Sequence, residues 1–185
     1  MTYFTSDLHM NNTNVIKYCD RPFVNAAEMN EALIDNWNSV VTMEDDVWVL
    51  GDFIMGQAET IFDILPCLNG NTIHLVPGNH DTPKKMEIYA ECPRVKIEQN
   101  LSQFYYKEYL FLLCHYPIVC NDYLHYMLKN NPKTITLFGH VHDVMPHKCF
   151  EHGPAFNVGV DVTNFTPVSI EQIIAAVEEE FNHDS

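Results

Sequence analysis

Basic residues are scarce in this sequence. Its 185 residues include 10 Lys and Arg against 25 Asp and Glu, which gives a formal net charge of -15 at pH 7. A surface of this sign repels a phosphate backbone, so we expect no extended nucleic acid among the partners. A bound metal pair would reverse the field locally. We therefore expect a small substrate.

Long apolar runs and paired cysteines are absent as well. The first residues, Met1 to Asp7, contain neither a basic stretch nor a long apolar core, so we expect no signal peptide. No run is long enough to span a bilayer, and we expect a cytoplasmic protein with no membrane partner. The six cysteines form no C-x-x-C pair, which argues against a thiolate zinc knuckle or a dithiol redox motif.

Strand-like and helix-like patterns follow one another along the chain. The composition, 46% hydrophobic and 19% charged, is typical of a globular protein, and the length predicts a single domain over residues 1–185. Alternating or apolar runs predict strands at 2–6, 46–50, 72–76, 95–97, 102–106, 109–114, 134–138 and 156–160. Helical spacing predicts helices over 25–41, 57–68 and 169–181, and Thr82 with Pro83 predicts a short one. The fold class is therefore α/β.

In the helix predicted over 57–68, the hydrophobic spacing places Ile61, Phe62, Ile64 and Leu65 on the inward face. The next strand, Thr72 to Val76, ends in Pro77-Gly78 and then in three consecutive polar residues, Asn79, His80 and Asp81. A packed core has no use for an amide, an imidazole and a carboxylate in a row. Because ligands of open α/β sheets bind beyond the carboxyl ends of strands, this turn indicates a functional site.

Four other strand-like runs end in the same way. A single histidine at a strand end is more often structural than a ligand. Five such strand ends in one chain are harder to explain by structural roles alone. Burying many unpaired imidazoles and carboxylates would be costly without a cation. The strand-end groups are Asp7 and His9, Asp52, Asn79 and His80, His115, and His140 and His142.

In chain order, the pattern D-x-H, G-D, G-N-H-D, H and G-H-x-H resembles that of the calcineurin-like metallophosphoesterases over nearly the whole chain. The segments around Trp37, Arg21 and Asp161 resemble the small stand-alone members of bacteria and phages. This resemblance implies a two-sheet β-sandwich flanked by helices, in four αββα layers. The H-x-H-x-D-H motif of zinc β-lactamases does not fit. The motif requires a histidine at its sixth position, and here the next histidine, His147, comes later, after Pro146.

The resemblance also implies two divalent metal ions bridged by Asp52. Oxygen and imidazole donors without a thiolate favour manganese, with iron, zinc, cobalt and nickel left open, over calcium. His80 would be the acid that protonates the leaving oxygen, with Asp81 orienting it. One ion would be held by Asp7, His9, Asp52 and His142, and the other by Asp52, Asn79, His115 and His140.

We therefore expect a phosphoesterase, a phosphatase or phosphodiesterase, in which a metal-bridging hydroxide attacks phosphorus in line. No G-x-S-x-G elbow offers a serine nucleophile. The alternative is a catalytically silent binding scaffold on the same fold. The oligomeric state cannot be read from the pattern.

Two basic residues are candidates for gripping a substrate phosphate, Arg21 and Lys17, although an arginine that pairs with local acids is an equal alternative for Arg21. Substrate choice is expected to depend on residues 10–23 and 116–133, and a nucleotide is among the candidates. Met10-Asn11-Asn12 replaces the sequence usual in relatives, which leaves the ligands intact but changes the residues just beyond them. Asp143 and Asp161 are candidates for supporting the ligand imidazoles.

Overall fold

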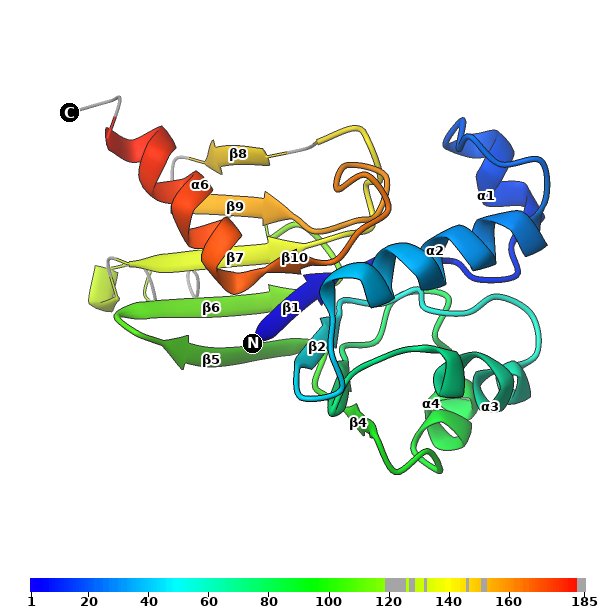
Figure 1. The fold of residues 1–185 in the computed structure, drawn as a ribbon. Coiled ribbons are helices and arrows are strands. Elements are labelled where there is room, and N and C mark those ends of the chain that lie inside the picture. Colours follow the sequence, from blue (N-terminus) through cyan, green and yellow to red (C-terminus); the bar gives the residue numbers. More distant parts are fainter. Residues whose placement is uncertain (119–125, 127–128, 132, 146, 151–152, 183–185) are drawn as a thin grey trace.

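The computed structural model describes residues 1–182 except 119–125, 127–128, 132, 146 and 151–152; residues 183–185 are likewise not described. Two mixed sheets of five strands each pack against one another, and helices flank them (Figure 1). This is the α/β arrangement of two sheets flanked by helices that the sequence predicts. Most of residues 119–128, part of the second loop expected to govern substrate choice, lies outside the described residues.

The first sheet has the strand order β10-β1-β2-β3-β4. Strands β1 to β4 run parallel to one another, and the edge strand β10 pairs antiparallel with β1. All of β1, β2 and β3 therefore have their carboxyl ends at the same edge of the sheet. The bounds are β1 Thr2–Thr5, β2 Asp46–Val49, β3 Thr72–Leu75, β4 Val95–Ile97 and β10 Val168–Ser169.

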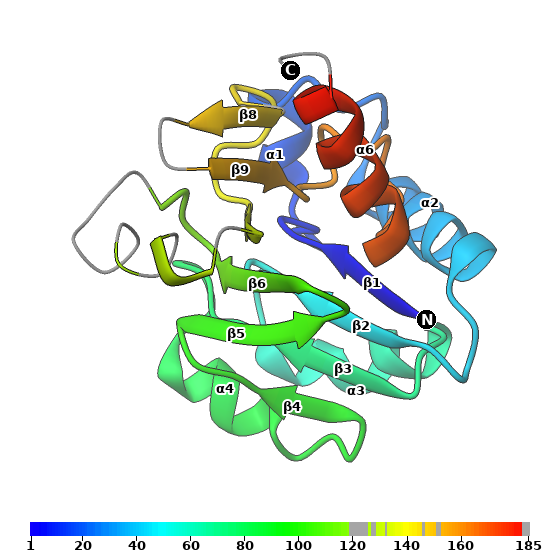
Figure 2. The ribbon, with the colours of Figure 1, turned by 90° about the vertical axis from the view of Figure 1, so that its left-hand side faces the viewer.

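The second sheet has the order β5-β6-β7-β9-β8. Strands β6, β7 and β9 run parallel, while β5 and β8 are antiparallel to their neighbours. Figure 2 shows β5 and β6 lying across β2 and β3 of the first sheet. The bounds are β5 Leu101–Tyr106, β6 Tyr109–Cys114, β7 Thr134–Phe138, β8 His147–Phe150 and β9 Gly153–Asn157.

The alternation of side chains along each strand divides the core in two. In β2, Val47 and Val49 face a cluster formed with the helices, whereas Trp48 faces the cluster between the sheets. That second cluster includes Phe111 of β6 and Ile173 of the C-terminal helix. Successive residues of a strand point to opposite faces, so one apolar strand serves both layers.

The helices follow the predicted caps. The Asn25 side chain accepts hydrogen bonds from two amides of the first turn of α2, and Ser169 with Gln172 forms the expected capping box before α6. Thr82 caps α4 in the same manner. The bounds are α1 Thr13–Tyr18, α2 Ala26–Val40, α3 Ile61–Ile64, α4 Pro83–Tyr89 and α6 Ile170–Asn182.

The prediction of one continuous helix over 57–68 is wrong. The structure divides the segment into a 3-10 turn (η1, Ala58–Thr60), the single turn α3 and a second 3-10 turn (η2, Leu65–Cys67). Pro66 lies in this segment and has no amide hydrogen to donate to the preceding turn. The tighter 3-10 turns also rotate the side chains, and Phe62, predicted to face inward, is 45% exposed.

The last predicted strand, 156–160, is also displaced. Strand β9 ends at Asn157, and β8 and β10 were not predicted. Val158 donates its amide to Phe138 of β7, but Gly159 then forms a parallel bridge with Ser6, directly after β1. Val160 donates to the carbonyl of Ser6 at 3.1 Å. This crossing joins the carboxyl ends of the parallel strands of both sheets, which is where the polar turns lie.

In the described part of the chain, no helix is long and apolar enough to cross a membrane.

Trp37 anchors α2 on the first sheet and provides a test of this packing. Its side chain is fully buried, and Nε1 donates to the Asn69 carbonyl at 2.8 Å. We expect Trp37→Ala to lower the free energy of unfolding by about 3–5 kcal/mol, measured by urea denaturation. The control Glu31→Ala, on the exposed face of α2, should change it by less than about 0.5 kcal/mol. Equal stability of the two variants would contradict this packing.

Candidate metal centre

The strand-end side chains converge where the two sheets meet, and their backbone is unusual. Five of them have left-handed backbone angles, a conformation that costs a non-glycine residue about 1–2 kcal/mol. Strain of this kind persists only where the surrounding structure imposes it and is typical of functional sites. These residues are Asp7 (φ 57°), His9 (φ 48°), Asp52 (φ 55°), His140 (φ 70°) and His142 (φ 49°).

Asp52 lies at the centre of the group. Its Oδ2 is 3.5 Å from Nε2 of His9 and 3.6 Å from Nε2 of His115. Its other oxygen, Oδ1, accepts the backbone amide of His80 at 2.9 Å. Asp52 is only 2% exposed. One carboxylate therefore faces imidazoles from both sheets, as a group shared by two ions would.

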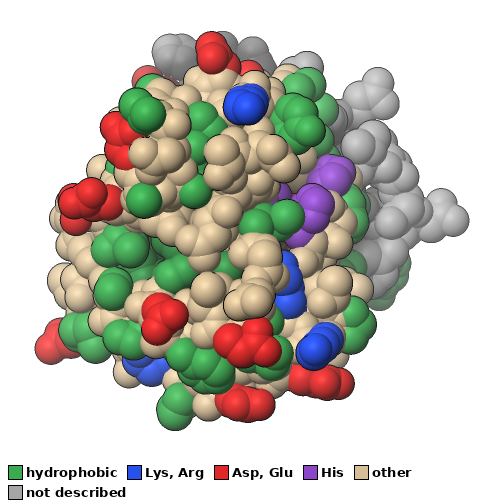
Figure 3. All heavy atoms as spheres, turned by 90° about the vertical axis from the view of Figure 1, so that its right-hand side faces the viewer, with side chains coloured by type: hydrophobic (Ala, Val, Ile, Leu, Met, Phe, Trp, Pro, Cys, Tyr) green, Lys and Arg blue, Asp and Glu red, His purple; other side chains and the backbone are tan. Residues whose placement is uncertain are grey.

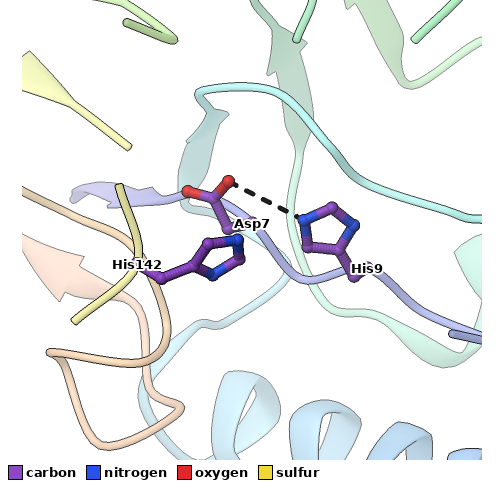
Figure 4. Close-up of side chains that lie close together, drawn as sticks. All are labelled: Asp7, His9 and His142. Carbon is purple, nitrogen blue, oxygen red and sulfur yellow. Dashed lines mark ion pairs between the residues drawn. The ribbon is translucent and has the colours of Figure 1, made fainter. Parts of the chain in front are cut away.

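Asp7 is a second buried carboxylate. It is fully buried, and Oδ2 accepts the backbone amide of His140 at 2.8 Å. Its Oδ1 has no hydrogen-bond partner among the described residues and lies 3.9 Å from Nε2 of His9 (Figure 4). Burial raises the pKa of the Asp7 carboxyl, against the lowering effect of His115 and His142. A cation beside Oδ1 would compensate for the lost hydration.

The contact between the His115 ring and the Asn79 side chain has no hydrogen atom between the two facing atoms. Nδ1 of His115 lies 2.8 Å from the Leu50 carbonyl, which can only accept, so we assign the ring hydrogen to Nδ1. Nε2 then carries a lone pair, yet it lies 2.9 Å from Oδ1 of Asn79 and faces the Asp52 carboxylate. Three electron-pair donors thus point at one another, which is the arrangement of atoms around a metal ion.

His9 and His142 lie side by side with a ring separation of 5.4 Å. Burial, together with His142 and Arg21, lowers the pKa of His9 to about 3. His9 is therefore neutral near pH 7 and keeps a lone pair for a metal. Figure 4 shows Asp7, His9 and His142 around a common point, and their ligand atoms lie within 4.8 Å of one another. Asp7, Asp52 and His115 form a second such group.

Arg21 supports this centre from behind. Its guanidinium donates to both oxygens of Asp161, at 2.7 and 2.8 Å, and to the backbone carbonyls of Asp7 and Leu8. Asp161 in turn accepts Nδ1 of His142 at 2.6 Å, as a carboxylate that orients a metal-binding imidazole does. Burial opposes ionisation of Asp161, but the hydrogen bonds from His142 and Arg21 outweigh it and lower its pKa.

Two glycines allow the turns to approach one another. A Cβ at Gly139 would lie 2.3 Å from Oδ2 of Asp7, and one at Gly78 would lie 2.3 Å from Oδ1 of Asp52. Both distances are far below van der Waals contact. The glycines in G-N-H-D and G-H-x-H are therefore required by the crowding of carboxylates at these turns.

The remaining predicted residues lie differently from expectation. Arg21 is buried and its donors are occupied, so it cannot also grip a substrate. Lys17 is exposed on α1. It does not line the cleft above the metal-type residues, by which we mean the strand-end side chains that could hold a metal ion. Asp81 accepts the backbone amides of Asp52 and Gly78 rather than orienting the His80 ring.

His80 itself lines the cleft, with its side chain 46% exposed and Nε2 4.0 Å from Oδ2 of Asp52. One supporting residue was missed by the sequence reasoning. The Asn157 side chain donates to the carbonyls of His142 and Met145 and accepts the amide of Gly159. The strand predicted over 156–160 placed Asn157 inside a strand rather than at the end of β9, and nothing local distinguishes it from a turn asparagine.

The donor set fits divalent cations. Two carboxylates, an amide oxygen and imidazole nitrogens surround a small volume, and buried atoms such as Oδ1 of Asp7 lack a partner among the described residues. Hard and borderline donors without a thiolate suit manganese, iron or zinc. The residues present could thus hold two ions on either side of Asp52.

The Arg21 network predicts a large stability effect at a residue that does not face the cleft. Arg21→Met leaves Asp161 and two backbone carbonyls without their cation, so we expect a loss of about 3–5 kcal/mol in urea unfolding of the metal-free protein. Lys17→Met, which removes an exposed cation from the neighbouring helix, should cost less than about 0.5 kcal/mol. A fully stable Arg21→Met protein with a raised KM would instead make Arg21 a substrate contact.

Comparison with known proteins agrees with this geometry. A family model described as the calcineurin-like phosphoesterase superfamily domain matches residues 2–167. The uncharacterized protein MJ1445 of Methanocaldococcus jannaschii is 34% identical over 179 residues, covering 95% of this chain and 90% of its own. The Gene 66 protein of Mycobacterium phage L5 is 26% identical over 183 residues, covering 86% of each chain.

Among solved structures, the protein of unknown function AQ665 from Aquifex aeolicus superposes with a TM-score of 0.71 at 23% identity, covering 96% of this chain and 99% of its own. That likeness concerns the fold. Because the family model matches residues 2–167, which include strands β1 to β9 and all the strand-end turns, this chain belongs to the calcineurin-like phosphoesterase superfamily.

Proposed function

We propose that this protein is a metal-dependent phosphoric ester hydrolase that cleaves a phosphomonoester or phosphodiester by in-line attack of water at phosphorus. The observation that carries the proposal is the position of the Asp52 carboxylate. It lies between the imidazoles of His9 and His115, and the His115 nitrogen that faces it carries no proton when Nδ1 donates to the Leu50 carbonyl. Membership of the family supports the same reading.

Two divalent ions, manganese first among the candidates, would supply the chemistry at this place by lowering the pKa of a water and stabilising charge on the phosphoryl oxygens. The chain's own residues divide into two holding groups. Asp7, His9, Asp52 and His142 would form one, and Asp52, Asn79, His115 and His140 the other. Asp161 and the Leu50 carbonyl fix the orientation of His142 and His115.

His80 is proposed as the acid at the leaving oxygen. Its amide is held by Oδ1 of Asp52, which fixes the turn, while its ring is half exposed in the cleft and meets the ring of His9 edge to face at 5.4 Å. A ring in this place can reach an ester oxygen above the metal-type residues. Asp81 contributes indirectly, because it holds the amides of Asp52 and Gly78.

The net charge of -15 supports a small substrate rather than an extended nucleic acid. The proposed location is the cytoplasm. A nucleotide remains among the candidate esters.

Metal dependence gives the direct test. We expect hydrolysis of bis(p-nitrophenyl) phosphate with Mn²⁺, its loss with a chelator, and its return with excess Mn²⁺. Asp52→Asn should lower metal content, measured by plasma mass spectrometry, and abolish turnover, because both groups lose their shared carboxylate. Asp35→Asn, exposed on α2, should change neither. A fully metallated wild-type protein that cleaves no monoester or diester would support the silent scaffold instead.

Removal of the acid should separate chemistry from metal binding. We expect His80→Ala to keep the metal content and the KM but to lose about 10²- to 10⁴-fold in kcat, with the larger loss for poor leaving groups. His74→Ala removes a histidine that stacks on Trp48 and contacts Glu98 away from the cleft, and it should leave kcat unchanged. If the wild type and His80→Ala have equal kcat, His80 is not the acid at the leaving oxygen.

A further inference from the structure

The cleft over the metal-type residues has a second, chemically different wall. It has a volume of about 570 Å³, within the range of small-molecule sites. His9, Asp52, Asn79, His80, His140 and His142 line one part of it. The other part is lined by residues of α1 and of the turn after it, by Met55 after β2, and by Val141 and Val144 after β7.

This second wall has more apolar than polar side chains, although Asn12, Asn14 and Asp143 also belong to it, and it is partly exposed. Val15 is buried in it, whereas Tyr18 is 84% exposed and Val144 is 80% exposed. Exposed apolar side chains that flank a polar centre are typical of a surface that binds an apolar ligand group. Figure 3 shows histidine side chains reaching the surface together on this face of the molecule.

The cleft also lacks basic residues. None of the described residues that line it is Lys or Arg, and Asp143 adds an acidic group to its wall. Arg21 lies behind the metal-type residues and is committed to Asp161. Lys85, on α4, donates to the carbonyls of Ile54 and His80 and does not line the cleft. A second phosphate or a carboxylate on the substrate would therefore find no Lys or Arg among the described residues of this cleft.

We propose that the Tyr18–Val144 wall, meaning the side chains of Val15, Tyr18, Met55, Val141 and Val144, binds the organic group of the substrate. The substrate class is then an ester with a single phosphoryl group and an uncharged aromatic or otherwise apolar group. Nucleoside diphosphates, triphosphates and polyphosphates fit less well, because no Lys or Arg among the described lining residues would meet their further phosphates. This inference rests on the proposed function, because the metals must hold the phosphoryl group while the wall receives the remainder.

Three phosphonates that share one metal-binding head test the wall by titration calorimetry with the Mn²⁺-loaded protein. Phenylphosphonate should bind about tenfold more tightly than methylphosphonate, because its ring loses contact with water against Tyr18 and Val144. 4-Carboxyphenylphosphonate should bind at least about tenfold more weakly than phenylphosphonate, since its carboxylate meets no cation.

Variants assign the effect to the wall. Tyr18→Ala and Val144→Ala should each reduce the preference for phenylphosphonate and leave methylphosphonate binding unchanged. Tyr105→Ala and Val24→Ala remove exposed residues of the same two types outside the cleft and should alter neither.

Equal binding of phenylphosphonate and methylphosphonate to the wild type, or tighter binding of the carboxylated compound, would overturn the inference while leaving the metal centre intact. Binding of neither head group to the metal-loaded protein would instead count against the proposed function itself.

Discussion

Electron-pair donors that face one another without an intervening proton impose the main constraint on this structure. Asp52, His9 and His115 point at one small volume, and Asp7 adds a fully buried carboxylate with an unpartnered oxygen among the described residues. Such a group is unfavourable unless positive charge is supplied. The fold resolves this by surrounding the donors with backbone amides, such as those of His80 and His140, and by leaving room for cations at the centre.

The cost of this arrangement is distributed over the surrounding scaffold. Left-handed backbone angles at Asp7 and His142 aim the side chains inward, and Gly139 lets the two turns touch. Arg21 and Asp161 then hold the turns in register through four hydrogen bonds to side-chain and backbone oxygens. A basic residue that looks like a substrate contact in the sequence is therefore part of the frame, and the cleft keeps no arginine of its own in the described part.

The predictability of each feature depends on how local its cause is. The sites at strand ends could be predicted because apolar runs and the polar residues after them are adjacent in the sequence, as at Thr72 to Asp81. Pairing of Arg21 with an acid was one of two alternatives that the sequence left open, but its partner could not be predicted, because Asp161 lies 140 positions away. The exposure of Phe62 was missed because Pro66 breaks a helix whose hydrophobic spacing looks regular. The apolar wall could not be predicted either, since Tyr18 belongs to α1 and Val144 to the turn after β7, far away in the sequence.

The bridge between Ser6 and Gly159 has a consequence for how the protein is made. Asp7 and His140, which share a hydrogen bond, are 133 positions apart, and the residues that lock them together follow still later in the chain. During synthesis strands β1 to β4 leave the ribosome before the second sheet and β10, so a nascent chain at that stage lacks His115, His140 and His142. The set of donors proposed to hold metal ions is then complete only after His140 and His142 have been made, in the final third of the polypeptide.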